Sequence, residues 1–334
     1  MKNQWYIACQ SGQLKSKPLA RTIMDQHIVL FRNHTGKPGA LIDRCIHRNL
    51  ALSRGRITEQ GLQCHYHGWT YDLEGQCTHI PAACEACGAA NQPKVRAYRV
   101  VEKQGFVWVY IAEGKGGHPD HAPMDFPQYA ARGWHTWVME RTFAGHAFHC
   151  VENFLDVPHT AHVHKGLFRS KESKTIQIEI TTGKDWVQAE FLNEERMESL
   201  VGKLLFPKNA RLVHTDRFML PYTTRVDYRI NDKRHFIIMS QCTPIDEHST
   251  RVFTYMAYRF SPLGRLVRCI FEPLSNCILN QDVDIIQEQT ADIQKTGPKK
   301  FLFHPTDVIA KEMRDLIDGK SLENHAPRTI RLRI

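Results

Sequence analysis

The sequence predicts an α+β protein in two parts, an all-β N-terminal part followed by a part with an antiparallel sheet and helices. Short strand-like runs separated by turn signals fill residues 27–112. The second part has alternating runs between about residues 174 and 260, with helical patterns before and after them. A stretch rich in Gly and Pro separates the two parts, and such stretches are typical of domain boundaries.

The Gly- and Pro-rich stretch is "EGKGGHPDHAP" at 113–123. We therefore expect a first domain over 1–115, a linker over 116–133, a second domain over 134–310 and a C-terminal tail over 311–334.

Two hairpins are predicted in the first domain. "HIVLFRN" and "GALIDR" lie on either side of the turn-rich "HTGKP". "VRAYRVVEKQGFVWVYIAEG" reads as two strands that meet at "KQG".

The second domain begins with the strand-like "GWHTWVMERTF" and a helical pattern after it. Its alternating runs predict an antiparallel sheet: "KTIQIEI", "DWVQAEFL", "TTRVDYRI", "RHFIIMSQC" and "RVFTYMAYRF". The segment from Pro262 onward reads as helix, with Pro273 as a candidate break. Helices on one side of the sheet follow from this order.

Composition narrows the function classes. The chain has 334 residues and 42% apolar residues, but no apolar run near the roughly 20 residues that span a bilayer. The N-terminus lacks a secretory pattern, so we expect a cytoplasmic protein without a membrane span. A net charge of +9 suits an acidic partner. The Lys and Arg residues are scattered without interleaved aromatics, which argues against nucleic acid.

Cysteine and histidine form two close pairs in the first domain. Cys45 and His47 are spaced C-x-H, and Cys64 and His67 are spaced C-x2-H. Two loops that each offer one thiolate and one imidazole can converge on a two-iron cluster. With the cysteines on one iron and the histidines on the other, this is a Rieske [2Fe–2S] centre. A Cys2His2 zinc site is the alternative, although zinc spacings usually pair like with like. We expect His65 at the surface or beside the ligands.

A second constellation follows in "ENFLDVPHTAHVH". Asp156, His159 and His164 are spaced D-x2-H-x4-H. Two histidines and a carboxylate are the ligands of non-heme Fe(II) oxygenases, which leave coordination positions open for O2. His162 is the alternative to His164. Without a metal, the same residues would form a polar helix end with surface histidines.

The segments "CIHRNLALSRGRI" and "LQCHYHGWTYDLEG" resemble the Rieske domain of the Rieske non-heme iron oxygenases, the ring-hydroxylating oxygenases, in their single-subunit branch. They do not resemble the respiratory Rieske proteins, whose extra cysteines are replaced here by Leu50 and Tyr66. The resemblance implies a helix-grip, START-like catalytic domain.

The resemblance also implies roles for residues in the second domain. His159 and His164 would bind a mononuclear Fe(II), and Asp156 would connect an iron-ligand histidine to the cluster histidine of a neighbouring subunit. Asn153 would lie near the iron. The family places a third ligand on a late helix, where Asp282 in "ILNQDVDIIQEQ" matches best and Asp284 is the alternative.

The resemblance implies that the activity is that of a terminal oxygenase, which uses O2 to hydroxylate or demethylate a small organic substrate. We expect this substrate to be apolar or aromatic. Electrons would come from NAD(P)H through a separate reductase, with an acidic ferredoxin as a further partner, because the chain has no G-x-G-x-x-G motif. It implies a homotrimer. Monooxygenation, dihydroxylation, demethylation and desaturation stay open. The competing hypothesis is a non-catalytic Rieske electron carrier or redox sensor with a ligand-binding domain.

Further cysteines and histidines lie outside these motifs. Cys77 and His79 are followed by Cys84 and Cys87, a pattern that can bind zinc. His146 and His149 precede the second constellation and can line its pocket, but core or solvent positions are the more ordinary ones for them.

Overall fold

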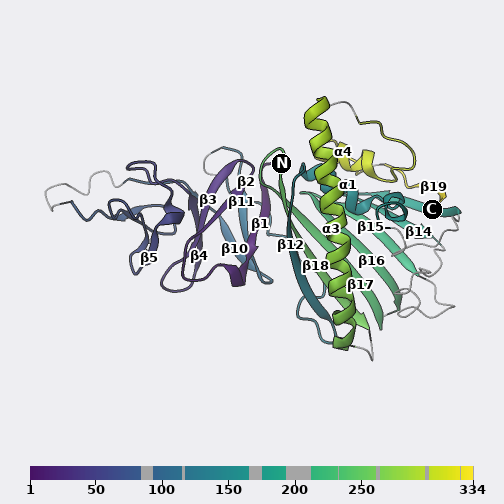
Figure 1. Cartoon of the computed structure of the whole chain (residues 1–334), viewed down its shortest axis with the longest axis horizontal. Helices are drawn as coiled ribbons and strands as arrows, with labels where there is room; N and C mark the ends of the chain where they lie inside the picture. Colours follow the sequence, from purple (N-terminus) through teal and green to yellow (C-terminus); the bar gives the residue numbers. More distant parts are fainter. Residues whose placement is uncertain are drawn as a thin grey trace. The chain divides into compact units, whose positions relative to one another are not determined.

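The chain divides into two compact units. The computed structural model describes residues 1–83, 93–114, 117–164, 175–192, 212–231, 233–260, 264–297, 301–323 and 325–333. The first unit is Met1–Asp125 and the second is Phe126–Ile334. Figure 1 shows short strands joined by loops in the first unit and a large sheet with helices in the second unit.

Three small antiparallel sheets make up the described part of the first unit, in the orders β1-β11-β10, β2-β3-β4-β9 and β5-β6-β7-β8. The strands are β1 (Gln4–Gln10), β2 (Leu19–Ile23), β3 (Gln26–Arg32), β4 (Pro38–Ile42), β5 (Arg56–Thr58), β6 (Gly61–Gln63), β7 (Thr70–Tyr71), β8 (Cys77–His79), β9 (Ala97–Tyr98), β10 (Val100–Lys103) and β11 (Phe106–Ile111). The predicted hairpins are confirmed, since β3 pairs with β4 and β10 pairs with β11.

The second unit contains an eight-stranded antiparallel sheet in the order β12-β18-β17-β16-β15-β14-β13-β19. Its strands are β12 (His135–Phe143), β13 (Thr175–Thr182), β14 (Trp186–Leu192), β15 (Val213–Met219), β16 (Thr223–Asn231), β17 (Arg234–Pro244), β18 (Thr250–Phe260) and β19 (Arg328–Arg333). Its helices are α1 (Ala147–Leu155), α3 (Gly264–Thr296) and α4 (Ala310–Ile317). The expected α+β class, with an antiparallel sheet and helices in the second part, is confirmed.

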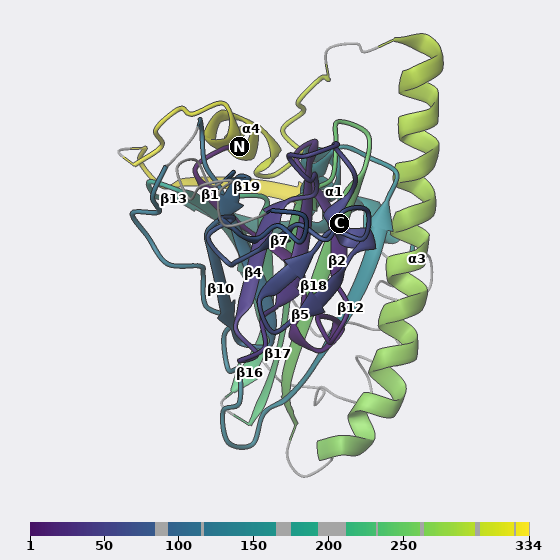
Figure 2. The same cartoon turned by 90° about the vertical axis from the view of Figure 1, so that its left-hand side faces the viewer.

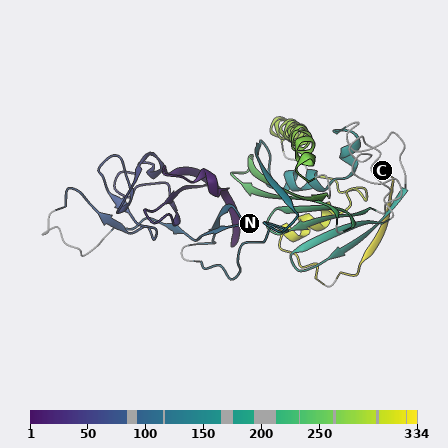
Figure 3. The same cartoon turned by 90° about the horizontal axis from the view of Figure 1, so that it is seen from below.

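One face of this sheet carries the helices (Figures 2 and 3). His214, Tyr228 and Phe236 lie in register on neighbouring strands, so their side chains share a face. Phe236 contacts Phe271 of α3, with ring centroids 5.1 Å apart, which identifies this face as the one that α3 covers. Helix α1 contacts strands β15, β16 and β17, and α3 contacts β12 and β18. Side chains from both helices can therefore meet above the sheet.

Two features differ from the sequence expectations. Residues 311–334, expected as a tail, include most of α4 and the whole of β19, and β19 pairs with β13 at the edge of the sheet. The backbone of β19 pairs with β13, which is distant in sequence, so the pattern of this short segment alone could not predict the pairing. Helix α3 also continues through Pro273 without a break. The buried Phe271, which packs on Phe236 and Phe260, helps to offset the helix-breaking effect of the proline.

No helix in the described part of the chain is both long enough and apolar enough to cross a lipid bilayer.

A glycine turn supports the sheet beside the cysteine and histidine loops. Gly75 has φ +79°, its N–H donates to Asp72 O, and its carbonyl accepts from Val95 N–H. A Cβ at this position would lie 2.3 Å from Val95 O. Gly36 has φ +83°, yet a Cβ there would meet nothing within 4 Å.

We expect Gly75→Ala to lower the free energy of unfolding of the metal-free chain well beyond the roughly 1–2 kcal/mol that a left-handed alanine costs by itself. The backbone oxygen of Val95 must move in addition. Gly36→Ala, which has the same backbone strain and no clash, should lose only the conformational part. Guanidinium unfolding of both variants checks this expectation, and equal losses would contradict it.

Candidate metal centres

The first cysteine–histidine loop connects β4 to β5 and is a tight, hydrogen-bonded turn. The Cys45 N–H donates to Leu50 O at 2.8 Å, and the Asn49 N–H donates back to Cys45 O at 2.9 Å. Asn49 has φ +58°, a left-handed conformation that asparagine tolerates. The turn holds Cys45 and His47 close together.

The second loop, between β6 and β7, repeats this pattern. The Cys64 N–H donates to Trp69 O at 2.8 Å, and the Gly68 N–H donates to Cys64 O at 3.1 Å. Gly68 has φ +74°, and a Cβ there would lie 2.7 Å from Pro81 Cγ, so glycine suits both the conformation and the space. Two loops of the same construction thus present Cys and His side by side.

The thiols and the imidazoles of these loops lie in different surroundings. Cys45 and Cys64 are each 2% exposed and belong to one buried core cluster. The rings of His47 and His67 lie 4.4 Å apart, and the Trp69 ring stacks on His47 at 4.5 Å. The Nδ1 atom of His47 is buried and has no hydrogen-bond partner. A metal on this nitrogen would satisfy it, so the residues present fit a metal cluster.

The four loop residues do not form one compact group of ligand atoms. In the described part of the chain, only His159, His164 and Asp282 bring three ligand atoms within 4.8 Å of one another. A more widely spaced arrangement of the cysteine pair and the histidine pair suits a two-metal cluster, whereas one tetrahedral zinc needs all four ligand atoms close together.

Tyr71, which the sequence did not single out, contacts one of the cysteines. Its hydroxyl lies 3.2 Å from Cys45 Sγ, and both side chains are buried. Burial and the contact with Cys45 raise the pKa of Tyr71, so the hydroxyl keeps its proton and can donate to a thiolate. Hydrogen bonds to cluster sulfurs are one of the factors that set reduction potentials. Its only sequence signal is its place two residues after the "YHGW" stretch.

The second constellation brings together residues from three segments. His159 lies in the 3-10 turn Pro158–Ala161 after α1, His164 follows it, and Asp282 lies on α3. The Nε2 atoms of the two histidines are 3.2 Å apart. Asp282 Oδ1 lies 3.1 Å from His164 Nε2 and 3.5 Å from His159 Nε2. His164 and Asp282 are 2% and 5% exposed, which keeps bulk water from the carboxylate side.

The hydrogen bonds of the two Nδ1 atoms show why this group attracts a cation. His159 Nδ1 contacts the carbonyl oxygen of Asp156, and His164 Nδ1 lies 2.8 Å from Gln281 Oε1. Both partners are acceptors, so each Nδ1 carries a proton and each neutral ring directs an Nε2 lone pair at Asp282. Three acceptors that face one another repel unless a positive charge lies between them. A divalent metal fits this donor set.

Without a bound metal, a proton can take the place of the cation between these groups, and the pKa values show this. Burial opposes ionisation of Asp282, but the hydrogen bonds from both histidines outweigh it and lower the pKa. Burial likewise disfavours the charged form of His164, but Asp282 raises its pKa. Gln281, which orients His164, was missed from the sequence, and its only signal is its position beside Asp282.

Asp156 and Asn153 lie beside the histidines and outside the ligand group. Asp156 follows the last residue of α1, and its Oδ2 atom lies 3.9 Å from His159 Nδ1. Burial, countered by His159, raises the pKa of Asp156, although 36% of the side chain is exposed. The Oδ1 atom of Asn153 is buried without a hydrogen-bond partner. Asp156 thus contacts His159 on one side and solvent on the other.

The alternative residues lie elsewhere. His162, Asp284 and His65 are exposed, and none of them belongs to the three-residue group.

The additional cysteine motif is only partly described. Cys77 is buried in the same core cluster as Cys45, and His79 is exposed. Cys84 and Cys87 lie outside the described residues.

A pocket of about 490 Å³ adjoins Asp156 and His159. Its wall contains several apolar side chains and also His149. The carboxylates that line it are those of Glu152, Asp156, Glu288, Asp292 and Asp307. The pocket is therefore strongly acidic at its polar surface, although the chain as a whole carries a net charge of +9.

Comparisons with known proteins agree with both halves of this description. The chain matches the Rieske [2Fe-2S] domain over residues 4–99 and the vanillate O-demethylase oxygenase C-terminal domain over residues 143–321. It is 32% identical over 198 residues to the oxygenase component of dicamba O-demethylase from Stenotrophomonas maltophilia, over 57% of this chain and 55% of that protein. It is 24% identical to the vanillate O-demethylase oxygenase subunit from Pseudomonas sp. (strain HR199 / DSM 7063), over 95% of this chain and 94% of that one.

The extent of these matches varies. A further relative, from Comamonas testosteroni, is 30% identical and is matched over 66% of its length, so the alignments with it and with the dicamba enzyme span less than two thirds of each relative. Among solved structures, dicamba monooxygenase bound to 3,6-dichlorosalicylic acid has a TM-score of 0.80 at 23% identity, covering 95% of this chain and 96% of that chain. This likeness shows a shared fold.

We expect Asp282→Asn to weaken metal binding by the second constellation at least about tenfold, because it removes the negative charge between the histidines. Asp284→Asn removes the same charge from an exposed position on the same helix and should leave binding unchanged. Titration of metal-depleted protein with Co(II), followed by its visible absorption, compares the two variants. Equal affinity in both would show that Asp282 is not a ligand.

Proposed function

The chain belongs to the Rieske oxygenases whose second domain is of the vanillate O-demethylase C-terminal type, and from this we propose that it is the terminal oxygenase of a multicomponent system. The observation that carries the proposal is the convergence of His159, His164 and Asp282 in a chain that also has the Cys45–His47 and Cys64–His67 loops. We assign the four loop residues to the [2Fe–2S] cluster and the other three to a mononuclear Fe(II).

When bound, the cluster carries electrons and the mononuclear iron supplies open positions for O2. The protein's own contribution is to position and shield. Gln281 and the carbonyl of Asp156 fix the orientation of the two histidine rings. The burial of His164 and Asp282 excludes water from the carboxylate side.

As reaction we propose oxidative demethylation or hydroxylation of a small aromatic compound. The relatives from Stenotrophomonas and Pseudomonas are named as O-demethylases, of dicamba and of vanillate. A methoxylated aromatic acid is therefore the substrate class to test first.

Electron delivery to the iron would cross between subunits of a homotrimer, and the charges of the chain support this proposal. The exposed side chains at the tips of the cluster loops include Arg44, Arg48 and His65, and none of the exposed residues at these tips is acidic. Ile46 and Tyr66, also at the tips, are large and exposed at 49% and 60%. The pocket beside Asp156 is lined by carboxylates and apolar side chains, which match the basic and apolar side chains of the loop tips. Opposite charges of this kind set orientation and favour association.

Asp156 has the position that an inter-subunit connection requires. Its carboxylate contacts the His159 ring and is also partly exposed at the acidic pocket. We infer that it accepts a hydrogen bond from a cluster histidine of the next subunit. Asn153, from the same helix, would support this contact through its buried amide oxygen.

The remaining partners are a reductase that uses NAD(P)H and an acidic ferredoxin. The net charge of +9 supports docking of an acidic carrier. A cytoplasmic location agrees with the free thiols of all the described cysteines, since disulfides are rare in reducing compartments.

The competing function, an electron carrier or sensor without catalysis, needs no second metal site. The observation against it is the buried acceptor group of His159, His164 and Asp282, which is costly to maintain without a cation.

To test the activity, we would compare the wild-type chain with His159→Ala, each supplied with a ferredoxin and a reductase, on a panel of methoxylated, N-methylated and unsubstituted aromatic compounds. Mass spectrometry should show loss of a CH2 unit or gain of an oxygen atom with the wild type alone. The cluster absorption of both proteins serves as the control, because His159 lies outside the cluster loops. The same products from both proteins, or none from either while the cluster is reduced, would favour the carrier.

Asp156→Asn should leave both metals bound and slow the single-turnover oxidation of the reduced cluster in the presence of substrate and O2 by about 10–100-fold, because the carboxylate that connects the centres is gone. Glu152→Gln is the matched control, since it removes a carboxylate from the same pocket. Stopped-flow absorption of the cluster measures both. An unchanged rate in Asp156→Asn would rule out the connecting role.

A further inference from the structure

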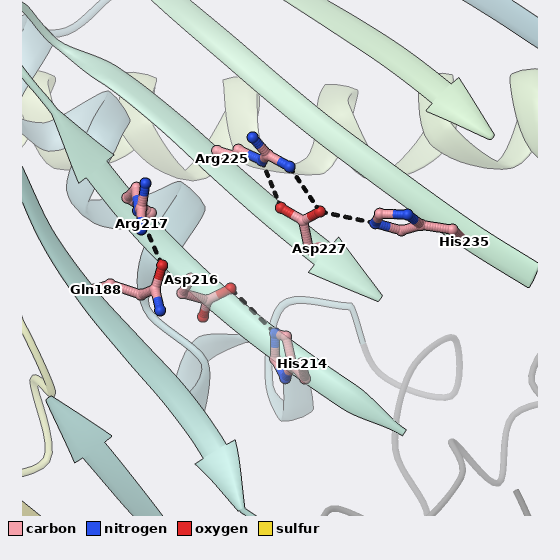
Figure 4. A network of polar contacts seen from close by, with 7 residues as sticks. All are labelled: Gln188, His214, Asp216, Arg217, Arg225, Asp227 and His235. Atoms are coloured by element: carbon pink, nitrogen blue, oxygen red, sulfur yellow. Dashed lines mark hydrogen bonds and ion pairs between the residues drawn. The ribbon is translucent and has the colours of Figure 1, made fainter. Parts of the chain in front are cut away.

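Two arginines face each other on neighbouring strands of the large sheet. Arg217 of β15 is directly opposite Arg225 of β16 in the antiparallel register. Residues in this relation have Cβ atoms about 5 Å apart, and like charges placed so are destabilising. The arrangement therefore needs an explanation, and the surrounding contacts, drawn in Figure 4, supply one.

Arg225 is held in place by an acid that has a second partner. Its Nε and Nη2 atoms donate to the two oxygens of Asp227 at 2.6 and 3.0 Å. His235 Nε2 lies 2.8 Å from Asp227 Oδ1. Burial opposes ionisation of Asp227, but the hydrogen bonds from His235 and Arg225 lower its pKa overall. Asp227 is thus already engaged on both oxygens and has little left for a second arginine.

Arg217 is held by neutral groups. Its Nε donates to Gln188 Oε1 at 2.9 Å, and its Cζ lies 4.5 Å from the centroid of the Trp186 ring. Within the described part of the chain, no carboxylate lies within 4 Å of its guanidinium. Asp185 and Asp227 attract it from farther away, while burial and Arg225 lower its pKa.

We propose that Arg217 and Arg225 form a binding site for a small oxyanion, a carboxylate or a phosphate, whose oxygens accept hydrogen bonds from both guanidinium groups. The Nη atoms of Arg217 are the principal donors, because Gln188 engages its Nε and, within the described residues, no carboxylate lies within 4 Å of the guanidinium. A planar guanidinium stacked on an indole is held at a fixed angle, which suits bidentate hydrogen bonding to a carboxylate or a phosphate. The bound anion would remove the repulsion between the opposed charges.

This site is separate from the mononuclear metal site. His214 and Asp216 alternate with Arg217 along β15, and His214 shares the face that α3 covers. Arg217 and Arg225 therefore lie on the opposite face of the sheet. Both are only partly exposed, and 31% of the Arg225 side chain is accessible. The inference does not depend on the proposed oxygenase activity.

The experiment titrates the full chain with inorganic phosphate, sulfate and benzoate, with chloride at matched ionic strength as the reference. Tryptophan fluorescence reports binding, because Trp186 stacks on Arg217, and Trp186→Phe should abolish the signal change. We expect saturable binding that becomes at least about tenfold weaker in Arg217→Gln. Arg217→Lys, which keeps the charge and loses the planar fork, should fall between the two.

The matched control is Arg251→Gln. Arg251 lies on the same face of the sheet, because Arg225 is in register with Met239 and Met239 with Tyr255, four positions from Arg251 on β18. It already has a carboxylate partner 3.6 Å away in Glu140. Its loss changes the net charge equally and should leave binding as in the wild type. Calorimetric melting adds a second measurement: without an oxyanion, Arg217→Gln should melt no lower than the wild type, since the repulsion is removed.

The outcomes separate clearly. Binding of benzoate alone would identify the site as one for organic acids, and binding of all three anions would identify a general oxyanion site. Absence of saturable binding, equal binding by Arg217→Gln, or a large loss of stability in that variant without added anion would each overturn the proposal.

Discussion

Three hydrogen-bond acceptors that face one another are the constraint on which the second unit depends. His159 and His164 lie in one segment after α1 and Asp282 lies far along the chain on α3, yet their ligand atoms lie within 4.8 Å of one another. A protein does not bring two imidazole lone pairs and a carboxylate together in a buried place unless a cation compensates them. The sheet, α1 and α3 form the scaffold that holds these acceptors in place, and the contacts of both Nδ1 atoms orient the rings.

The first unit holds its candidate metal ligands in a different way, with two loops of the same construction. Two loops with identical backbone hydrogen bonds present cysteines to the core and histidines to the surface. The thiols are buried, whereas His67 is exposed and His47 is half-buried, so the two sides of such a site are unequal. The imidazole side is the side that can be approached by another molecule, which is what an electron-transfer centre needs. The acidic pocket beside Asp156 and the basic tips of the loops are complementary in charge.

The outer face of the large sheet adds a feature that the chemistry of the metals does not explain. Opposed arginines whose nearest acid, Asp227, is already engaged by Arg225 and His235 are costly unless a further anion is available. On the same strands, side chains such as His214 and Tyr228 lie on the face that α3 covers, whereas Arg217 and Arg225 lie on the opposite face. The alternation of a β-strand thus allows one strand to contribute to two unrelated functions.

The sequence by itself determined the ligand types, the α+β class and most strands, because these depend on local spacing and alternation. The C-x-H and C-x2-H pairs and the D-x2-H-x4-H motif could be read in single short segments. Only the tertiary structure decided what depends on register and helix phase. Asp282 points inward and Asp284 outward because α3 packs on the sheet in one orientation. Tyr71 reaches Cys45, β19 pairs with β13, and Arg217 opposes Arg225 for the same reason: each contact joins strands or loops whose alignment is set by the packing of the whole unit and leaves no pattern in either segment alone.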